Sequence, residues 1–228
     1  MGDAAGRIQS GVLTRADITA LIDTGRPQHL VDCDLDEADL AMLDLSGWTV
    51  EQCTLRRADL SGARLERSIW RSCRGAFANF LGSDLTDAVL TSCDFNNGVF
   101  RKAMLTSASF TGCKLTGVDL SEAKAMDVRF AETLLIGAKL PSLSFHKASL
   151  NRIDFSQADL RKCDFRQVVF NECSLRDANM QGARFEGADL RDADLGGLRL
   201  VDAGLFRGAT ISRDQAGQML AELGLNVR

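Results

Sequence analysis

A large apolar residue recurs at every fifth position over most of this 228-residue chain. Between residues 30 and 205 there are 36 positions whose number is divisible by five, and Leu occupies 21 of them and Phe ten. We call these the centre positions. A spacing of five matches neither the 3.6-residue period of an α-helix nor the two-residue period of a β-strand. The chain is therefore expected to bring one large side chain inward with every five residues, which argues against helix bundles and ordinary open sheets.

A second pattern lies two residues before each centre position, where Ala and Cys predominate. We expect the centre residue and this small residue to point inward and the other three to point outward. Five residues then form one side of a square coil, and four sides make a coil of 20 residues. The 180 residues of the range 30–209 make about nine such coils, with no insertion in the frame. Backbone groups pair between successive coils, so the pattern predicts an all-β solenoid.

Several of the five-residue units share a sequence that is known from other proteins. Examples are ADLSG at 58–62, ANFLG at 78–82, ADLRK at 158–162 and ADLRD at 188–192. These units resemble the A(D/N)LXX repeat of the pentapeptide repeat family, over about four fifths of the chain. The resemblance implies a right-handed quadrilateral β-helix. It says much less about function, because the family hosts many unrelated roles.

Residues 1–29 are expected to form an N-terminal helical cap before the repeats at 30–209. Thr14 is the predicted N-cap, Asp17 lies near the capping-box position, and Gly25 ends the helix. A solenoid needs such a lid because an uncovered edge pairs with other chains. The apolar face that would cover the first coil consists of Ile18, Leu21 and Ile22.

Residues 210–228 are expected to form a second helix and a tail. Ser212 and Gln215 match a capping box, and Gly224 ends the helix. The segment resembles the C-terminal dimerisation segment of one branch of the family, and its apolar residues exceed what one coil end can cover. Both points predict a symmetric homodimer. The predicted interface consists of Met219, Leu220, Leu223, Leu225 and Val227.

All seven cysteines occupy the small inward position. We interpret them as core residues with free thiols, which fits a reducing compartment. A straight ladder of thiols does not supply the convergent tetrahedral ligands of a zinc site, so we expect no metal and no cofactor. Six of the cysteines share one side of the coil, and Cys163 lies on the opposite side. The six are Cys33, Cys53, Cys73, Cys93, Cys113 and Cys173.

No constellation of catalytic residues stands out, and we expect the protein not to be an enzyme. The two histidines, His29 and His146, are far apart, and no nucleophile or nucleotide-binding motif is present. The Asp residues that precede many centre positions are expected to bond to nearby backbone. Two centre positions lack a large side chain. We expect Trp70 to fill the space at Gly75, and no compensating residue is evident for Ala125.

The acidic residues gather in the first coil, residues 30–49, which has no Lys or Arg. The net charge of the whole chain is only −4, and the later coils are close to neutral. We therefore expect this acidic band to contact a partner. Its members are Asp32, Asp34, Asp36, Glu37, Asp39 and Asp44.

Two function hypotheses remain open. The first is a non-enzymatic interaction scaffold or effector that binds an unidentified protein, which the mixed charge of the later coils favours. The second follows from the resemblance. Some family members mimic duplex DNA, bind type II topoisomerases and protect them from quinolones or natural products, so DNA gyrase or topoisomerase IV would be the partner.

Neither hypothesis involves direct contact with nucleic acid or a membrane. The chain has no apolar run of the roughly 18 residues that a membrane span requires, and no secretion signal is recognised at its start. We therefore expect a cytoplasmic protein.

Overall fold

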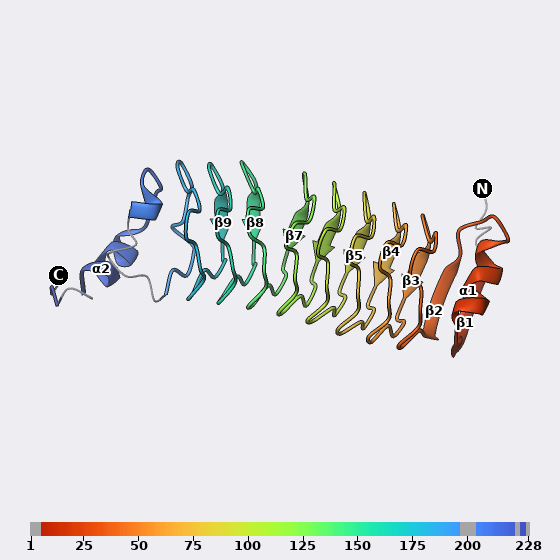
Figure 1. Ribbon diagram of the computed structural model, residues 1–228. Coiled ribbons are helices and arrows are strands. Elements are labelled where there is room, and N and C mark those ends of the chain that lie inside the picture. Colours follow the sequence, from red (N-terminus) through yellow and green to blue (C-terminus); the bar gives the residue numbers. More distant parts are fainter. Residues whose placement is uncertain (1–5, 197–203, 222–223, 227–228) are drawn as a thin grey trace, which may run out of the picture. The chain divides into compact units, whose positions relative to one another are not determined.

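The computed structural model describes residues 6–196, 204–221 and 224–226. The chain divides into two compact units, Met1–Arg129 (unit 1) and Phe130–Arg228 (unit 2). The described residues form nine parallel strands and two helices (Figure 1). The predicted all-β solenoid is confirmed, with the range 30–129 making about five coils and the range 130–189 about three.

Unit 1 begins with a strand and a helix and continues as a stack of parallel strands. From β2 onward, successive strands of the stack are offset by one whole coil, as in the pairs Val50↔Trp70 and Leu90↔Phe110. The other sides of each coil pair through isolated parallel bridges with the same offset. The elements are β1 (Arg7–Val12), α1 (Arg15–Ile22), β2 (His29–Asp34), β3 (Thr49–Glu51), β4 (Ile69–Arg71), β5 (Val89–Thr91) and β6 (Ser109–Thr111).

Unit 2 repeats this arrangement and ends in a helix. β8 (Ser149–Asn151) and β9 (Val169–Asn171) pair in parallel, with Leu150 opposite Phe170. β7 (Arg129–Ala131) precedes them, and α2 (Arg213–Ala221) closes the described part of the chain. Because such short strands cannot hold a sheet alone, the stability comes from the packing inside the coils.

The two inward positions form the core, as the sequence predicts. Nearly all centre residues are buried, and the phenylalanines stack along the axis of each unit. In unit 1 the rings of Phe80 and Phe100 lie 4.4 Å apart, and in unit 2 those of Phe145 and Phe165 lie 5.1 Å apart. Each fully buried Phe or Leu contributes about 1.5–3 kcal/mol. The repeated pattern therefore produces a continuous core rather than separate clusters.

The period of five has a backbone cause at the corners of the coil. From residue 32 to residue 187, every residue two positions after a centre has a positive φ, for example Glu37 at 58° and Arg57 at 56°. One position before the centre, an Asp or Asn side chain commonly accepts a hydrogen bond from the backbone two residues later. Asp59 Oδ1 accepts from the Ser61 N–H at 2.9 Å. This confirms the predicted role of these Asp residues.

The N-terminal lid contains more than the expected helix. α1 starts after the N-cap Thr14, whose capping box with Asp17 is confirmed, and Ile18 is only 1% exposed. β1 was not predicted. Ile8 pairs with Leu30, which is two positions more than one coil, so the start of β1 lies outside the numbering frame of the later repeats.

The repeat frame breaks once near its C-terminal end, and the prediction of an uninterrupted frame to residue 205 was wrong. Asp189 pairs with Thr210, so their offset exceeds one coil by a single position. Phe206 is buried and its ring lies 4.7 Å from that of Phe185, so it takes the centre position expected for Leu205. Part of the predicted ninth coil, residues 197–203, lies outside the described residues.

The space at Gly75 is filled differently from the prediction. A Cβ at residue 75 would overlap the ring of Phe95, so the ring of the next coil, not Trp70, occupies this volume. Trp70 packs edge-on against Phe95, with ring centroids 6.2 Å apart. Its indole N–H donates to the Ser68 hydroxyl at 2.8 Å, which satisfies a polar group inside the core.

Candidate functional site

The predicted acidic band is largely neutralised by arginines from neighbouring segments. Asp36 binds the guanidinium of Arg56, with 2.5 Å between Oδ2 and Nη2, and also accepts the Arg56 backbone N–H at 2.7 Å. Partial burial raises the pKa of Asp36, but the Arg56 hydrogen bonds and charge bring it below its usual value overall. Three further pairs are Glu37–Arg57 at 3.5 Å, Asp39–Arg15 at 2.8 Å and Asp44–Arg64 at 2.9 Å.

The other two members of the band accept hydroxyl groups. Asp32 accepts from Ser10 at 3.3 Å, and Asp34 accepts from Thr54 at 3.0 Å. In the described part of the chain neither forms an ion pair. The sequence placed all six carboxylates on the first coil correctly, but it did not reveal the arginines that lie against four of them.

An exposed aromatic side chain lies next to this band. Phe77 is 57% exposed. Together with Ala76 and two of the ion pairs described above, it lines a hollow of about 270 Å³. The pairs are Asp36–Arg56 and Glu37–Arg57, whose members lie one and two coils before Phe77. We call these six residues the Phe77 corner. The five-residue pattern does not predict this corner, although Phe77 is one of only two phenylalanines outside the centre positions.

In unit 2 three of the carboxylates are paired with an arginine that lies close to them in the chain. Asp159 binds Arg161, Asp164 binds Arg166, and Asp189 binds Arg191, always two residues later in the chain. Asp164 also accepts from Arg184 of the next coil at 2.9 Å. Hydrogen bonds from Arg166 are the main cause that lowers the pKa of Asp164 to about 2. These carboxylates are therefore not presented as a free acidic row.

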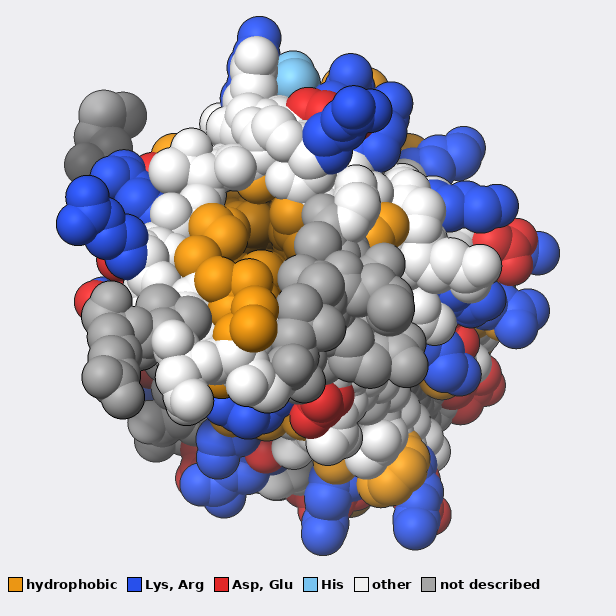
Figure 2. Space-filling model, turned by 90° about the vertical axis from the view of Figure 1, so that its left-hand side faces the viewer, with side chains coloured by type: hydrophobic (Ala, Val, Ile, Leu, Met, Phe, Trp, Pro, Cys, Tyr) orange, Lys and Arg blue, Asp and Glu red, His pale blue; other side chains and the backbone are white. Residues whose placement is uncertain are grey.

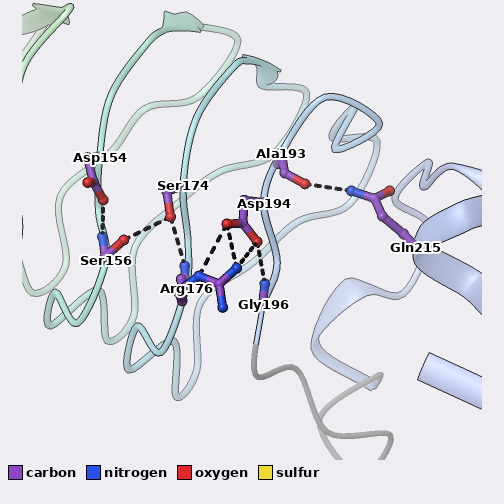
Figure 3. Close-up of polar contacts among 8 residues, drawn as sticks. All are labelled: Asp154, Ser156, Ser174, Arg176, Ala193, Asp194, Gly196 and Gln215. Carbon is purple, nitrogen blue, oxygen red and sulfur yellow. Dashed lines mark hydrogen bonds and ion pairs between the residues drawn. The ribbon is translucent and has the colours of Figure 1, made fainter. Parts of the chain in front are cut away.

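A ladder of polar contacts leads along one side of unit 2 to its end (Figure 3). The hydroxyls of Ser156 and Ser174 lie 2.8 Å apart, and Arg176 binds the carboxylate of Asp194 at 2.9 Å. Asp194 also accepts the backbone N–H of Gly196 at 2.8 Å. This hydrogen bond is the main cause that lowers the pKa of Asp194.

Gln215 attaches α2 to the end of the solenoid (Figure 3). Its side-chain amide donates to the carbonyls of Leu190 and Ala193 at 2.8 and 2.7 Å. Its Oε1 accepts the backbone N–H of Ser212, and its own N–H donates to the Ser212 hydroxyl, which confirms the predicted capping box. The residue is only 9% exposed. A sequence pattern that predicts a helix start thus also holds the lid in place.

The predicted dimer interface is only partly described. Leu220 is 38% exposed, Leu225 is 52% exposed and Met219 is half-buried. Leu223 and Val227 lie outside the described residues. Figure 2 shows this end of the chain, where hydrophobic side chains gather in a hollow with Lys and Arg side chains around the periphery.

The thiols are free and buried, as predicted. Burial raises the pKa of Cys53 and of Cys163 to about 12, so neither forms a nucleophilic thiolate near neutral pH. Within the described ranges, no three His, Cys, Asp or Glu side chains are grouped so that they could hold a metal ion. No helix in the described part of the chain is long and apolar enough to cross a membrane.

Comparisons with known structures find the same fold. A trypsin-treated variant of QnrB1, a plasmid-mediated fluoroquinolone resistance protein, matches with a TM-score of 0.71 and 23% identity, over 89% of this chain and 98% of that one. Full-length QnrB1 matches with a TM-score of 0.64 and 20% identity, over 96% and 100%. HetL of Nostoc sp. strain PCC 7120, which is involved in heterocyst differentiation regulation, matches with a TM-score of 0.56 and 19% identity, over 86% and 94%.

Sequence comparisons point to the same family. Among curated proteins, no sequence matches this chain. Family models do match: one for eight copies of pentapeptide repeats at residues 53–91, one for a pentapeptide repeat region at 83–152, and one for nine copies at 135–213. Together with the buried centre positions and the positive-φ corners, these matches show that the chain belongs to the pentapeptide repeat family.

Proposed function

We propose that this protein is a non-enzymatic solenoid that binds a protein partner through its outer surface. The observation that carries the proposal is that the inward and the outward positions of each coil have different roles. The inward residues fill the core, while the outward side chains recur at fixed places in every coil. Repeat proteins use such extended regular surfaces for binding. The raised pKa values of the buried thiols argue against nucleophilic chemistry at these residues.

A second candidate function is binding to DNA gyrase or topoisomerase IV, with protection from quinolones or natural products. It is supported by the likeness to QnrB1, which extends over nearly the whole of both chains. The charge pattern speaks against simple mimicry of DNA. A DNA mimic needs an extended acidic surface, whereas here most described ion pairs join a carboxylate to an arginine of the same or the next coil.

Gyrase supercoiling assays with and without a quinolone test the second candidate. A protector restores supercoiling in the presence of the drug as its concentration rises, and the variant with Asp34, Asp36 and Glu37 changed to Lys does not. A protein that neither inhibits nor protects gyrase at roughly 100-fold molar excess refutes gyrase binding. Topoisomerase IV decatenation is measured in the same way.

The first candidate is tested with photo-crosslinkers placed at outward positions on different sides of the coil. A real partner is captured from one side of the solenoid only, and a charge reversal on that side abolishes the capture without changing the melting temperature. Capture that is equal from all sides reflects non-specific contact and contradicts the proposal. The free thiols support a reducing, cytoplasmic location for this partner.

We further propose that the C-terminal segment forms a symmetric homodimer. The exposed Leu220 and Leu225 support it, because a second copy would cover the apolar end of the unit. Light scattering tests it at micromolar concentration, with the double variant Leu220→Asp and Leu225→Asp against the control Met42→Asp, an exposed apolar residue in unit 1. A monomeric wild-type protein refutes the dimer.

A further inference from the structure

We infer that the Phe77 corner is a docking site for a basic protein segment that inserts an aromatic side chain beside Phe77. This inference rests on the proposed protein-binding function and names the surface and the chemistry of the partner. The corner comprises the hollow and its lining residues Asp36, Glu37, Arg56, Arg57, Ala76 and Phe77.

The first argument is the backbone position of Phe77. It lies two residues after a centre, where φ is positive in every coil, and its own φ is 63°. Bulky side chains are disfavoured in this conformation, and the described residues at this position are otherwise small or polar except for Met42. Burial of the ring does not offset the cost of this backbone conformation, since the ring is 57% exposed. An aromatic residue at such a place is explained by a contact outside the chain.

The second argument is the shape of the hollow. The outward positions next to Phe77 are stacked along the corner, and Ala76 is short where the preceding coil has Arg56. The resulting space of about 270 Å³ is slightly below the roughly 300–1,000 Å³ of small-molecule sites, and it is open to the surface. Its size suits a single side chain of a protein. Aromatic rings and arginine guanidinium groups together favour an aromatic occupant.

The third argument is the contrast between the two ion pairs. Asp36 holds Arg56 by several short bonds, and its side chain is only 18% exposed. Glu37 and Arg57 are 73% and 70% exposed and 3.5 Å apart. The inner pair therefore forms a fixed wall, whereas the outer pair is loose enough to separate. Arg57 can then stack on an incoming ring, and Glu37 becomes free for a cation of the partner.

Arginines neutralise four of the six carboxylates of the first coil, and the two that remain favour a basic partner. Asp32 and Asp34 have no ion pair in the described part of the chain, and the first coil has no cation of its own. Glu37 lies two coils from Phe77. In an extended partner segment, residues two apart face the same side, about 7 Å from each other. A Lys or Arg at that distance from the aromatic residue reaches Glu37 with its long side chain.

A random-peptide library displayed on phage tests the inference. The immobilised full-length protein is the target, and the Phe77→Ser variant is used for counter-selection. Enriched peptides are expected to carry an aromatic residue and a Lys or Arg two positions away. They should bind the Phe77→Ser and Glu37→Lys variants about tenfold more weakly or worse.

Met42→Ser is the matched control, because Met42 occupies the same kind of corner, with φ 62° and 76% exposure. This variant should bind the peptides as the wild type does. Melting curves must show that all three variants fold. Peptides that bind the Phe77→Ser variant equally well refute the site but leave the protein-binding function standing. A selection that enriches nothing over the Phe77→Ser protein also refutes the site, and the crosslinking experiment then decides on the function.

Discussion

At the N-terminal end a helix closes unit 1 with an apolar side chain, whereas at the C-terminal end a helix closes unit 2 with an amide. Both helices start with a capping box, Thr14 with Asp17 and Ser212 with Gln215. Ile18 of α1 is 1% exposed, and Gln215 of α2 is 9% exposed and bonded to two carbonyls.

The difference follows from what each end leaves open. In unit 1 the strand β1 lies on β2 and pairs with its backbone. The exposed guanidinium of Arg15 in α1 donates to the carbonyls of Asp39 and Ala41 at 3.2 and 3.1 Å. The buried Ile18 is therefore left with apolar surface to cover.

In unit 2 the carbonyl of Ala193 needs a donor, and the Gln215 amide supplies it. The same amide also donates to the carbonyl of Leu190, which already accepts the backbone N–H of Ala193. The same local start of a helix therefore serves two different kinds of lid, α1 in unit 1 and α2 in unit 2, both of which are labelled in Figure 1.

The largest effect is expected for Ile18→Ala. Loss of a buried Ile side chain lowers the free energy of unfolding by about 2–5 kcal/mol, because it removes apolar contacts and leaves a cavity. Denaturant melts measure the change, and hydrogen exchange should show faster opening of β1 and β2. Leu21→Ala, at a half-buried position of the same helix, is the control and should cost less. Equal costs would contradict the view that Ile18 anchors this lid.

The second largest effect on stability is expected for Gln215→Leu. Leu donates no hydrogen bond, so the carbonyl of Ala193 loses its donor, while that of Leu190 keeps only the backbone N–H of Ala193. Unfolding therefore becomes easier by about 1–3 kcal/mol. The measurement is a melt of the full chain, together with hydrogen exchange in α2. Gln218→Leu, exposed on the same helix, is the control. If Gln215→Leu is as stable as the wild type, the amide is not the anchor of the C-terminal lid.

Acidification should lower stability more through a carboxylate of unit 2 than through one in the N-terminal lid of unit 1. The pKa of Asp164 in unit 2 is lowered to about 2 in the folded chain, below its value of about 3.9 in unfolded chains. The carboxylate therefore stabilises the fold above pH 4, and this contribution, on the order of 2 kcal/mol, is lost as the pH falls from about 4 to about 2.

Denaturant melts at pH 5 and pH 2 test this for the wild type, Asp164→Asn and Asp17→Asn. Asp164→Asn should lose less stability on acidification than the wild type. Asp17→Asn should change this loss less than Asp164→Asn does, because the hydrogen bonds from Thr14 that lower the pKa of Asp17 lie at an exposed place in the N-terminal lid. The same pH dependence in all three proteins would show that Asp164 does not carry the effect.

The smallest effect is expected for Arg15→Met. The side chains of Arg15 and Asp39 are 43% and 64% exposed, so their ion pair is worth less than about 1 kcal/mol and weakens with salt. Arg15 also donates to the carbonyls of Asp39 and Ala41, but these contacts are exposed and water replaces them in the variant. Melts at low and high salt concentration measure it. A cost as large as that of Ile18→Ala would reverse the ranking of the two contacts in this lid.

The sequence predicts the repeating part of the fold well because one residue pattern is repeated in every coil. The inward burial of Leu60, Phe80 and Cys53 and the Asp turns follow from that pattern. Both capping boxes, which lie outside the repeats, follow from local helix-start signals. The pattern fails where the frame shifts. Ile8 and Phe206 both occupy inward places outside the divisible-by-five numbering, so β1 and the extra residue near the C-terminal end were missed.

The candidate site was predicted less well, for a physical reason. The acidic residues of the first coil are visible in the sequence, but their partners lie one coil later in the chain, as in Asp36–Arg56 and Asp44–Arg64. Counting charge within one coil misses pairs between coils. No role was predicted for Phe77, because the pattern singles out the Phe residues at centre positions, although an aromatic residue at an outward place is itself informative.

The corner geometry also limits how a chain of this kind can change in length. Duplicating one whole coil puts every later side chain back on the same side and at the same distance from its neighbours. A single added residue instead moves every later inward position by one residue number. The extra position between Asp189 and Thr210 is such an insertion: Phe206 takes the inward place that the frame assigns to residue 205, and Thr210 still pairs with Asp189. Growth by whole coils therefore keeps the frame in the middle of each unit, whereas the single added residue is accommodated at the end of the repeats, next to the lid.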